Sequence, residues 1–491
     1  MKKKVSLLLC LIMVLSGLLL LAGCSSEEKV IMLWGPEEHR DLYLQWASEF
    51  KASHEKELKG YTFDFAGSGN AGAYGNMSVD PTKGAAIYSF PNDQMANLAN
   101  LNALSPLGQN ELAWAQENNI EASVEAAKLG EKYMAYPLQA DNGFYLYYNK
   151  SAFRGTSVWD EANDCLVSEF TFQDLYNALD EKNDKWANGL VSWAFGDSWY
   201  VSGVFFAVGG DYEVTYNSEG KQTSASCTFG YTLPEGKTSY KDGDFTVGET
   251  AVQCLVNTFR NPDGTINKHF LYTDSDKVPY NDTVSTYTNP NNPQFEESPL
   301  AATVNGTWKA AELQKNWGED YAATWLPMLV DDAGNKYAWK TFAGYNLLGV
   351  NPMCEFVQDD PEHIMILHEL AQYMSSKEAQ IARYQVSGAG PANKEALQDE
   401  AVVNDVALKA LNAQYARECT YPAGEKAGQP VGNGLGYRVQ DSVPANYWTP
   451  IQNFAQTLWQ EYNAGELNQF SENSLHKTLG QLQMDIEKSV Q

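Results

Sequence analysis

The sequence predicts an α/β protein with two domains or lobes. The chain has 491 residues, which is more than one hydrophobic core usually serves. Its opening reads as strand, helix and strand, an order that favours a parallel sheet flanked by helices. Residues 301–313 change from a strand-like to a helix-like period around one tight turn. Because 44% of the residues are hydrophobic and 20% are charged, we expect most of the chain to fold.

The β-α-β opening occupies residues 30–65. Val30–Trp34 is a short buried-strand pattern, and Gly35-Pro36-Glu37-Glu38 follows it. An apolar residue then recurs every four positions from Leu42 through Trp46 to Phe50, which predicts one apolar face of a helix. Tyr61–Phe65 alternates like a second strand. This order of elements predicts the parallel sheet of the first lobe.

A glycine-rich segment, Gly67–Gly72, follows the second strand and fits the GxGxxG pattern of dinucleotide-binding loops. We reject that function, because the fingerprint follows the first strand of its domain, whereas a strand and a helix already precede Gly67. Ala85–Phe90 reads as the next strand, and Asp93 lies just past its carboxyl end. This carboxylate either faces a ligand or caps the helix that follows.

Residues 301–313 predict a strand, a sharp turn and a helix. Thr303 and Val304 suit a buried strand, Asn305-Gly306 suits the turn, and Thr307 can cap the helix. Trp308 then lies beyond the carboxyl end of a strand, which is where ligands bind in open α/β sheets. Its indole is either a packing group or a platform for a ligand.

The first 28 residues predict export and lipid anchoring. Three lysines precede the apolar run Val5–Leu21, and Leu21-Ala22-Gly23-Cys24 resembles a lipobox. We expect residues 1–23 to be a lipoprotein signal peptide, Cys24 to carry the lipid, and residues 24–28 to form a tether at the extracellular face of the cell membrane. The alternatives are an ordinary signal peptide or an uncleaved anchor helix. No later segment has 18 uninterrupted apolar residues.

The formal charge limits the partners. Removing residues 1–23 deletes three lysines and no acids, which lowers the net charge from −28 to −31. A surface this acidic repels nucleic acid and gains nothing from anionic headgroups, whereas neutral or cationic ligands suit it. Without a CxxC pair, at most two disulfides can form and none is expected to be essential. The cysteines whose pairing stays open are Cys165, Cys227, Cys254, Cys354 and Cys419.

Several motifs occur in one order along the chain. Pro137-Leu138 is followed by Asp141-Asn142 and the aromatic strand Gly143–Lys150. This segment resembles the strand that leaves the first lobe in the family 1 extracellular solute-binding proteins, the ligand-capturing components of ATP-driven importers. Further segments are similar to that family, and to its maltodextrin-binding members, over nearly the whole mature chain: Trp34–Glu38, Asp197–Tyr200, Thr303–Trp308, Trp325–Pro327, Thr341–Tyr345, Ser375–Gln380, Gly388–Lys394 and Val443–Trp448.

The resemblance implies a type II periplasmic-binding-protein fold, in which each lobe is a mainly parallel sheet flanked by helices and a hinge joins the lobes. We expect lobe 1 to hold residues 29–140 and 345–418, and lobe 2 to hold residues 141–344 and 419–491. The protein would be a monomeric receptor, not an enzyme, without cofactor or metal. It would capture an oligosaccharide, most simply a maltodextrin, and deliver it to an ABC permease and, through it, to the ATPase.

An oligosaccharide offers apolar faces and a rim of hydroxyls, so its receptor needs aromatic platforms and hydrogen-bonding groups. Charge-assisted hydrogen bonds to carboxylates contribute roughly 1.5 to 3 kcal/mol each. The candidate platforms are Trp34, Trp199, Tyr200, Trp308 and Trp448. The candidate polar groups are Glu37, Glu38, Asp93, Asp197 and either Asp141 or Asn142, whose alignment with the family stays open.

The chain also departs from the family. Gln94 stands after Asp93 where maltose binders have an arginine, and residues 211–300 predict longer loops or an added hairpin. Three alternatives remain: a receptor for another glycan, a receptor for a cationic or metal ligand, and a tethered glycoside hydrolase using Glu37 with Asp197. His363 and His368 are five residues apart, a spacing that misses one helix face, and no GxSxG, HExxH or GxxxxGK[ST] motif occurs.

Overall fold

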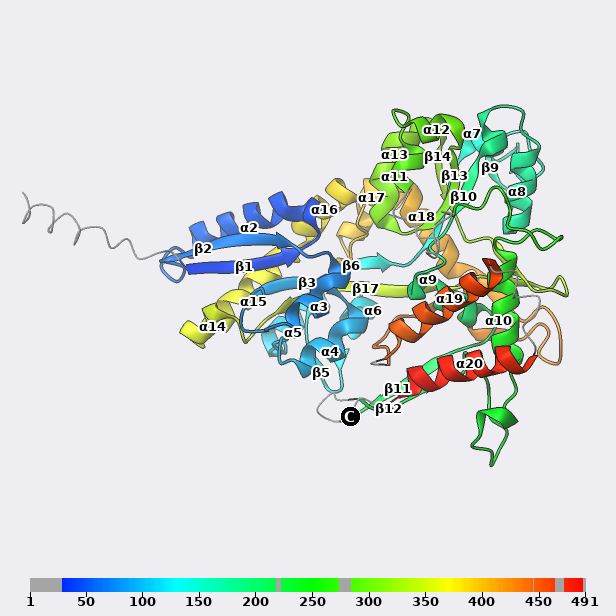
Figure 1. Ribbon diagram of the computed structural model, residues 1–491. Helices are drawn as coiled ribbons and strands as arrows, with labels where there is room; N and C mark the ends of the chain where they lie inside the picture. The colour runs from blue at the N-terminus through cyan, green and yellow to red at the C-terminus, as the bar shows by residue number, and fades with distance from the viewer. Residues whose placement is uncertain (1–28, 218–221, 273–283, 445, 464–471, 489–491) are drawn as a thin grey trace, which may run out of the picture.

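Two α/β lobes lie side by side in the molecule (Figure 1). The computed structural model describes residues 29–217, 222–272, 284–444, 446–463 and 472–488. The predicted signal peptide, the tether and Cys24 lie outside these residues. Within the described ranges, none of the helices has the length and apolar character needed to cross a membrane.

The first lobe is built on a six-stranded sheet. Strand β1 is parallel to β2 and β3, whereas β17 is antiparallel to β3 and β6 and parallel to β20. The strands run in the order β2 (Tyr61–Gly67), β1 (Lys29–Gly35), β3 (Ile87–Pro91), β17 (Thr341–Val350) and β20 (Tyr437–Val439), with β6 (Tyr136–Asn142) also paired to β17.

Successive side chains of β1 point to opposite faces of the sheet, and each face packs in its own apolar cluster. Ile31 and Leu33 pack on one side with α2 and α15, and Met32 and Trp34 pack on the other with α3 and α4. On α2, Trp46 and Phe50 are buried as the sequence predicts, while Tyr43 rather than Leu42 takes the third buried position. The helices are α2 (Arg40–Ser53), α3 (Ala73–Met77), α4 (Met95–Asn100), α5 (Gln109–Asn118), α6 (Glu121–Glu125), α14 (Glu355–Asp359), α15 (His363–Met374), α16 (Lys377–Ser387) and α17 (Glu400–Asn404).

The second lobe is built on a four-stranded sheet in the order β10 (Leu190–Ser192), β13 (Leu300–Asn305), β7 (Tyr145–Asn149) and β14 (Tyr321–Thr324). Strands β10 and β13 are parallel, but β7 is antiparallel to both of its neighbours. The sheets are therefore mixed rather than mainly parallel. The antiparallel pairs come from β7 and β17, because these strands continue directly from the other lobe instead of returning through a helix.

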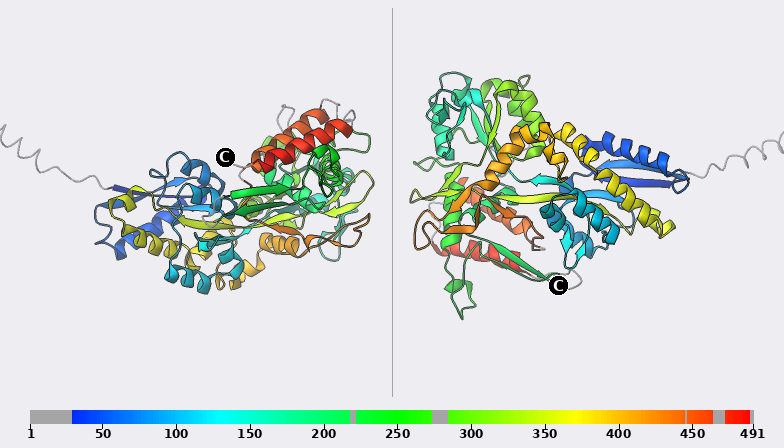
Figure 2. Two further views of the ribbon diagram at one scale, coloured as in Figure 1. Left: turned by 90° about the horizontal axis from the view of Figure 1, so that it is seen from below. Right: turned by 180° about the vertical axis from the view of Figure 1, so that it is seen from behind.

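Aromatic residues fill the core of the second lobe, including the fully buried Trp193, Trp339 and Trp459. Helices α19 and α20 pack against each other there, as the left view of Figure 2 shows. The helices are α7 (Lys150–Phe153), α8 (Phe172–Asp180), α9 (Ser198–Ala207), α10 (Thr246–Asn257), α11 (Val284–Thr288), α12 (Pro293–Glu297), α13 (Ala310–Trp317), α18 (Val406–Ala416), α19 (Trp448–Asn463) and α20 (Glu472–Glu487).

Short antiparallel pairs complete the fold. The pair β11–β12 is the hairpin that residues 211–300 were expected to add, and the five cysteines are all unpaired. The pairs are β4 (Lys128–Leu129) with β5 (Lys132–Tyr133), β8 (Trp159–Asp160) with β9 (Cys165–Leu166), β11 (Tyr212–Tyr216) with β12 (Gln222–Cys227), β15 (Met328–Val330) with β16 (Lys336–Ala338), and β18 (Glu418–Thr420) with β19 (Pro430–Leu435).

At least three segments of chain connect the lobes. The first lies between β6 and β7, the second leads into β17 from β16, and the third leaves β20 for α19. Helix α18 packs against β14 and β7 of the second sheet, although the expected boundaries place it in lobe 1. The exact lobe boundaries stay a prediction.

Candidate functional site

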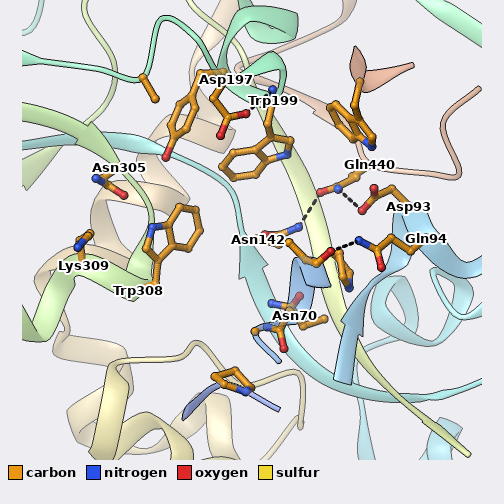
Figure 3. A pocket seen from close by; sticks show the side chains of 18 of the residues that line it. Asn70, Asp93, Gln94, Asn142, Asp197, Trp199, Asn305, Trp308, Lys309 and Gln440 are labelled. Atoms are coloured by element: carbon orange, nitrogen blue, oxygen red, sulfur yellow. Dashed lines mark hydrogen bonds between the residues drawn. The ribbon is translucent and has the colours of Figure 1, made fainter. Parts of the chain in front are cut away.

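A cavity of about 800 Å³ is lined by residues of both lobes (Figure 3). Its wall is formed where strands end. A short helical turn or a helix begins at the cavity after the carboxyl ends of β1, β3 and β13, at Glu37–His39, Asn92–Gln94 and Thr307–Lys309, respectively. This is the position at which open α/β sheets bind ligands. The turn at 305–308 and Asp93 therefore lie where the sequence places them.

Aromatic side chains form the wall on the second lobe. Trp199 and Trp308 lie with ring centroids 5.6 Å apart and planes inclined by 48°. Trp199 is held from behind by Phe144 and Phe342, at centroid distances of 5.0 and 6.2 Å. Trp308 is 45% exposed, in contrast to the buried tryptophans of the core. Such a surface suits an apolar ligand face.

Gly306 explains how Trp308 reaches this position. A Cβ atom at residue 306 would lie 2.1 Å from the indole ring, a distance that no real contact allows. The ring therefore rests directly on the backbone of the turn. The Asn-Gly pair serves this close approach as well as the turn itself.

Asp93 lies on the opposite wall with Gln440, and Trp448, at the start of α19 in the second lobe, reaches it. Gln440 donates a hydrogen bond of 2.7 Å from Nε2 to Asp93 Oδ1, and the Trp448 side chain also hydrogen-bonds to this carboxylate. Burial raises the pKa of Asp93 to about 7, although both hydrogen bonds act to lower it. Asp93 can therefore change its charge near neutral pH.

Amide side chains supply most of the remaining polar wall. Asn346 donates a 2.9 Å hydrogen bond to Gln139, and Asn70 accepts one of 2.6 Å from Ser89. The Nδ2 atom of Asn305 is buried and has no partner among the described residues, so a ligand oxygen could satisfy it. The amides that line the cavity are Asn70, Gln94, Asn142, Asn305, Asn346 and Gln440.

Other ionisable residues of the wall already form hydrogen bonds or ion pairs within the protein. Glu37 makes a two-fold hydrogen bond to Arg40, at 2.6 and 2.9 Å, which lowers the pKa of Glu37. Asp197 caps α9 by accepting from the backbone N–H of Trp199, while burial raises its pKa. Lys309 pairs with Glu312 at 3.1 Å.

Nine of the predicted residues line the cavity: Glu37, Glu38, Asp93, Asn142, Asp197, Trp199, Tyr200, Trp308 and Trp448. Two predicted residues lie elsewhere. Trp34 is partly buried, packs in the apolar cluster with α3 and α4, and is not among the residues that line the cavity. Asp141 is buried and accepts hydrogen bonds of 2.6 Å from Thr307 Oγ1 and from the Gly390 N–H. Neither side chain is among the residues that line the cavity.

Asp141 and Asn142 thus have different surroundings. Burial raises the pKa of Asp141 to about 6, and its hydrogen bond to Thr307 opposes that shift. Through its hydrogen bonds, Asp141 links the 305–308 turn to the segment around Gly390. Asn142, in contrast, lines the cavity. The described residues contain no group of three or more His, Cys, Asp or Glu side chains that could hold a metal ion.

A family model described as bacterial extracellular solute-binding protein matches residues 45–410. No curated protein sequence matches the chain. Solved structures do. The chain is similar to the maltodextrin-binding protein MalE1 of L. casei BL23, with a TM-score of 0.61 and 19% identity over 94% of this chain and 100% of that one.

Two further structures are similar to the same extent. The maltotriose-binding protein of Thermus thermophilus, bound with maltotriose, gives a TM-score of 0.61 at 16% identity over 93% of this chain and 98% of that one. The GacH receptor of Streptomyces glaucescens, solved unliganded and with acarbose, gives 0.61 at 15% identity over 94% and 100%. At such identities the likeness shows the fold. The predicted type II periplasmic-binding-protein fold is confirmed.

Proposed function

The chain belongs to the bacterial extracellular solute-binding protein family, and from this premise we propose that it is a receptor for an oligosaccharide of the maltodextrin type. The ligand is captured between the two lobes and passed to an ABC permease and its ATPase. The lipid on Cys24 holds the receptor at the extracellular face of the cell membrane. The protein acts as a monomer and catalyses no reaction of its own.

The opposed walls of the cavity are the observation that carries this proposal. A sugar ring has two apolar faces and a rim of hydroxyls, so an aromatic wall facing a carboxylate and amide wall matches both parts at once. Trp308 and Trp199 supply the faces, and Asp93 supplies a carboxylate acceptor from the other lobe. A ligand that contacts both walls favours the closed arrangement of the lobes.

A cationic ligand fits this wall less well. Burial raises the pKa of Asp93 to about 7, so this carboxyl is only partly ionised near neutral pH, and Asp197 is engaged as the cap of α9. Glu37 is already paired with Arg40. Neutral hydroxyls need only acceptors and donors, which the six amides of the wall provide.

The proposal is tested by calorimetric titration of the chain truncated before Cys24 with maltotriose, maltotetraose, and xylo-, fructo- and galacto-oligosaccharides. We expect heat with the α-glucans. Binding of another glycan alone would overturn the maltodextrin assignment and leave the fold unaffected. Trp325→Ala is a matched control for cavity variants, because Trp325 is half-buried in the second lobe and donates to Ser168 O outside the cavity.

Hydrolysis is tested with the same protein. Incubation with maltodextrin should leave the number of reducing ends unchanged. An increase that Glu37→Gln or Asp197→Asn abolishes would establish a glycoside hydrolase and sink the receptor function.

A further inference from the structure

Gln440 occupies an unusual place for a cavity residue. It follows β20 directly, is 2% exposed, and has no motif around it in the sequence. Its backbone N–H donates to Ala343 O at 2.9 Å, and its carbonyl oxygen accepts from the Asn92 side chain. The backbone of Gln440 is thus fixed on two sides, and its side chain is buried.

The side chain of Gln440 links two groups of the cavity wall, Asn142 and Asp93, through two consecutive hydrogen bonds. Asn142 Nδ2 donates to Gln440 Oε1 at 2.8 Å, and Gln440 Nε2 donates to Asp93 Oδ1 at 2.7 Å (Figure 3). Asp93 also receives the hydrogen bond of Trp448, the first residue of α19. Each bond orients the next group, because a carboxamide that accepts at its oxygen and donates at its nitrogen cannot turn over.

Except for Asp93, the members of this chain of bonds come from segments that connect the lobes. Asn142 ends β6 at the first connection, and Gln440 and Trp448 lie at the third. Gly344 lies on β17, at the second connection, and it pairs with Asn142 in the sheet. A Cβ atom at residue 344 would lie 1.9 Å from Gln440 Oε1 and 2.9 Å from Asn142 Nδ2, so glycine leaves the room that the two amides need.

We propose that Gln440 is a positioning residue of the binding site, which holds Asn142 and Asp93 so that their remaining donor and acceptor positions meet one ligand. Gln440 keeps one Asp93 oxygen engaged, and the rest of the carboxylate accepts from ligand hydroxyls. Asn142 retains a second N–H and its own oxygen for the same purpose. This inference rests on the proposed function, because it concerns the same cavity and a hydroxyl-bearing ligand.

The surroundings of Asp93 give the proposal a second readout. Burial raises the pKa of Asp93, and three hydrogen bonds oppose it: one from its own backbone N–H, one from the amide of Gln440 and one from the indole of Trp448; no charged side chain of the described residues contributes. Removing the Gln440 donor removes one of the two side-chain interactions that oppose burial. The carboxyl of Asp93 should then titrate at a higher pH in the empty protein.

The test compares the wild-type chain, truncated before Cys24, with Gln440→Leu and Gly344→Ala. Binding of maltotriose is measured by calorimetry between pH 5.5 and 8.5. The Asp93 carboxyl is titrated by carbon NMR in the absence of sugar, with its signal assigned by Asp93→Asn. For Gln440→Leu we expect Kd at pH 8 to rise about tenfold, which corresponds to one lost hydrogen bond to a charged group. The pH at which affinity is half lost should rise together with the carboxyl titration.

Two control variants separate positioning from folding. Gln483→Leu removes another buried glutamine, which accepts from the Gly230 and Tyr231 N–H groups away from the cavity. Gly349→Ala inserts a Cβ on the same strand as Gly344, but against Leu104. Both should lower the melting temperature without changing Kd or the titration of Asp93.

The outcomes are distinct. An unchanged titration of Asp93 in Gln440→Leu, or a raised one with unchanged Kd, overturns the positioning role. Failure of the wild-type protein to bind maltotriose removes the proposed ligand. A titration that is raised in Gln440→Leu and Gly344→Ala would still support the link from Gln440 to Asp93 in that case.

Discussion

The two walls of the cavity are built on different principles. The wall on the second lobe presents the faces of Trp199 and Trp308, and Trp308 is held in place mainly by shape, against Gly306 and Trp199. The wall on the first lobe presents carboxylate and amide groups, and Asp93 is held by hydrogen bonds from Gln440 and Trp448. Trp308 is thus held by packing, whereas Asp93 is held by polar contacts.

This difference predicts how each wall tolerates change. An exposed platform contributes through the area it covers on the ligand, so its removal should cost affinity and little stability. A buried hydrogen-bonded group affects affinity, stability and pH dependence together, because its removal leaves its hydrogen-bond partners buried and unpaired. Substitutions in each wall can therefore separate the two principles.

The largest effect is expected for Trp308→Ala. Tryptophans that anchor an interface commonly contribute about 2 kcal/mol or more, which is roughly 30-fold in Kd. Because Trp308 is 45% exposed, unfolding free energy should fall by clearly less than the roughly 3 to 5 kcal/mol that a fully buried tryptophan costs. Calorimetry with maltotriose and urea denaturation measure the two quantities.

Trp339→Ala and Trp325→Ala are the controls for this prediction. Trp339 is fully buried, so its removal should cost about 3 to 5 kcal/mol of stability. Trp325→Ala should leave Kd unchanged. Equal losses of affinity and stability in Trp308→Ala would mean that Trp308 is a packing residue of the core rather than a ligand platform. The contrast between the walls would then not hold.

Asp93→Asn is expected to have the next largest effect. The change keeps the shape and removes the charged acceptor, so affinity at pH 8 should fall by about 1.5 kcal/mol, or tenfold. In the wild-type protein the pKa of Asp93 is about 7, so affinity should decrease as pH falls through 7 and protonation removes the charge. This pH dependence should be absent from Asp93→Asn when Kd is measured from pH 5.5 to 8.5.

The stability of the empty protein should depend on Asp93 in the opposite direction. Its folded pKa, about 7, lies above the ordinary value of 3.8, so the folded state binds the proton more tightly than the unfolded state. This contribution is complete below pH 4 and is lost as pH rises through 7. Urea midpoints of wild type and Asp93→Asn should therefore diverge between pH 4 and 8, and parallel curves would show that Asp93 is solvated.

Much of the aromatic wall could be predicted from the sequence, because its signals are local. The change of period around Asn305-Gly306 places Trp308 at a strand end, and Asp197–Tyr200 follows a motif of the family. The pattern around Trp34 was also local, but Trp34 is not among the residues that line the cavity. It is partly buried in the apolar cluster with α3 and α4, and the sequence of β1 does not indicate this packing.

The amide wall was largely missed because it depends on contacts between distant segments. Gln440 reaches Asp93 across 347 positions, and Asn346 reaches Gln139 across 207. No period or motif marks these residues. The choice between Asp141 and Asn142 likewise depends on Thr307 and Gly390, which are distant in the sequence and become neighbours only on folding. The antiparallel direction of β7 and β17 has the same origin in the crossings between the lobes.

Glu37→Gln should have the smallest effect, and it sharpens the comparison within the polar wall. Glu37 and Asp93 both follow a strand of the first sheet, but Glu37 is exposed and engaged by Arg40, whereas Asp93 is buried. A solvent-exposed pair is screened and contributes little, so Kd for maltotriose should change by less than about threefold and its pH profile should stay that of the wild type. The same titration in 0.5 M salt provides the control, since screening should leave wild type and variant indistinguishable. A loss as large as that of Asp93→Asn would instead mean that ligand binding releases Glu37 from Arg40, and Arg40→Ala would then tighten binding rather than leave it unchanged.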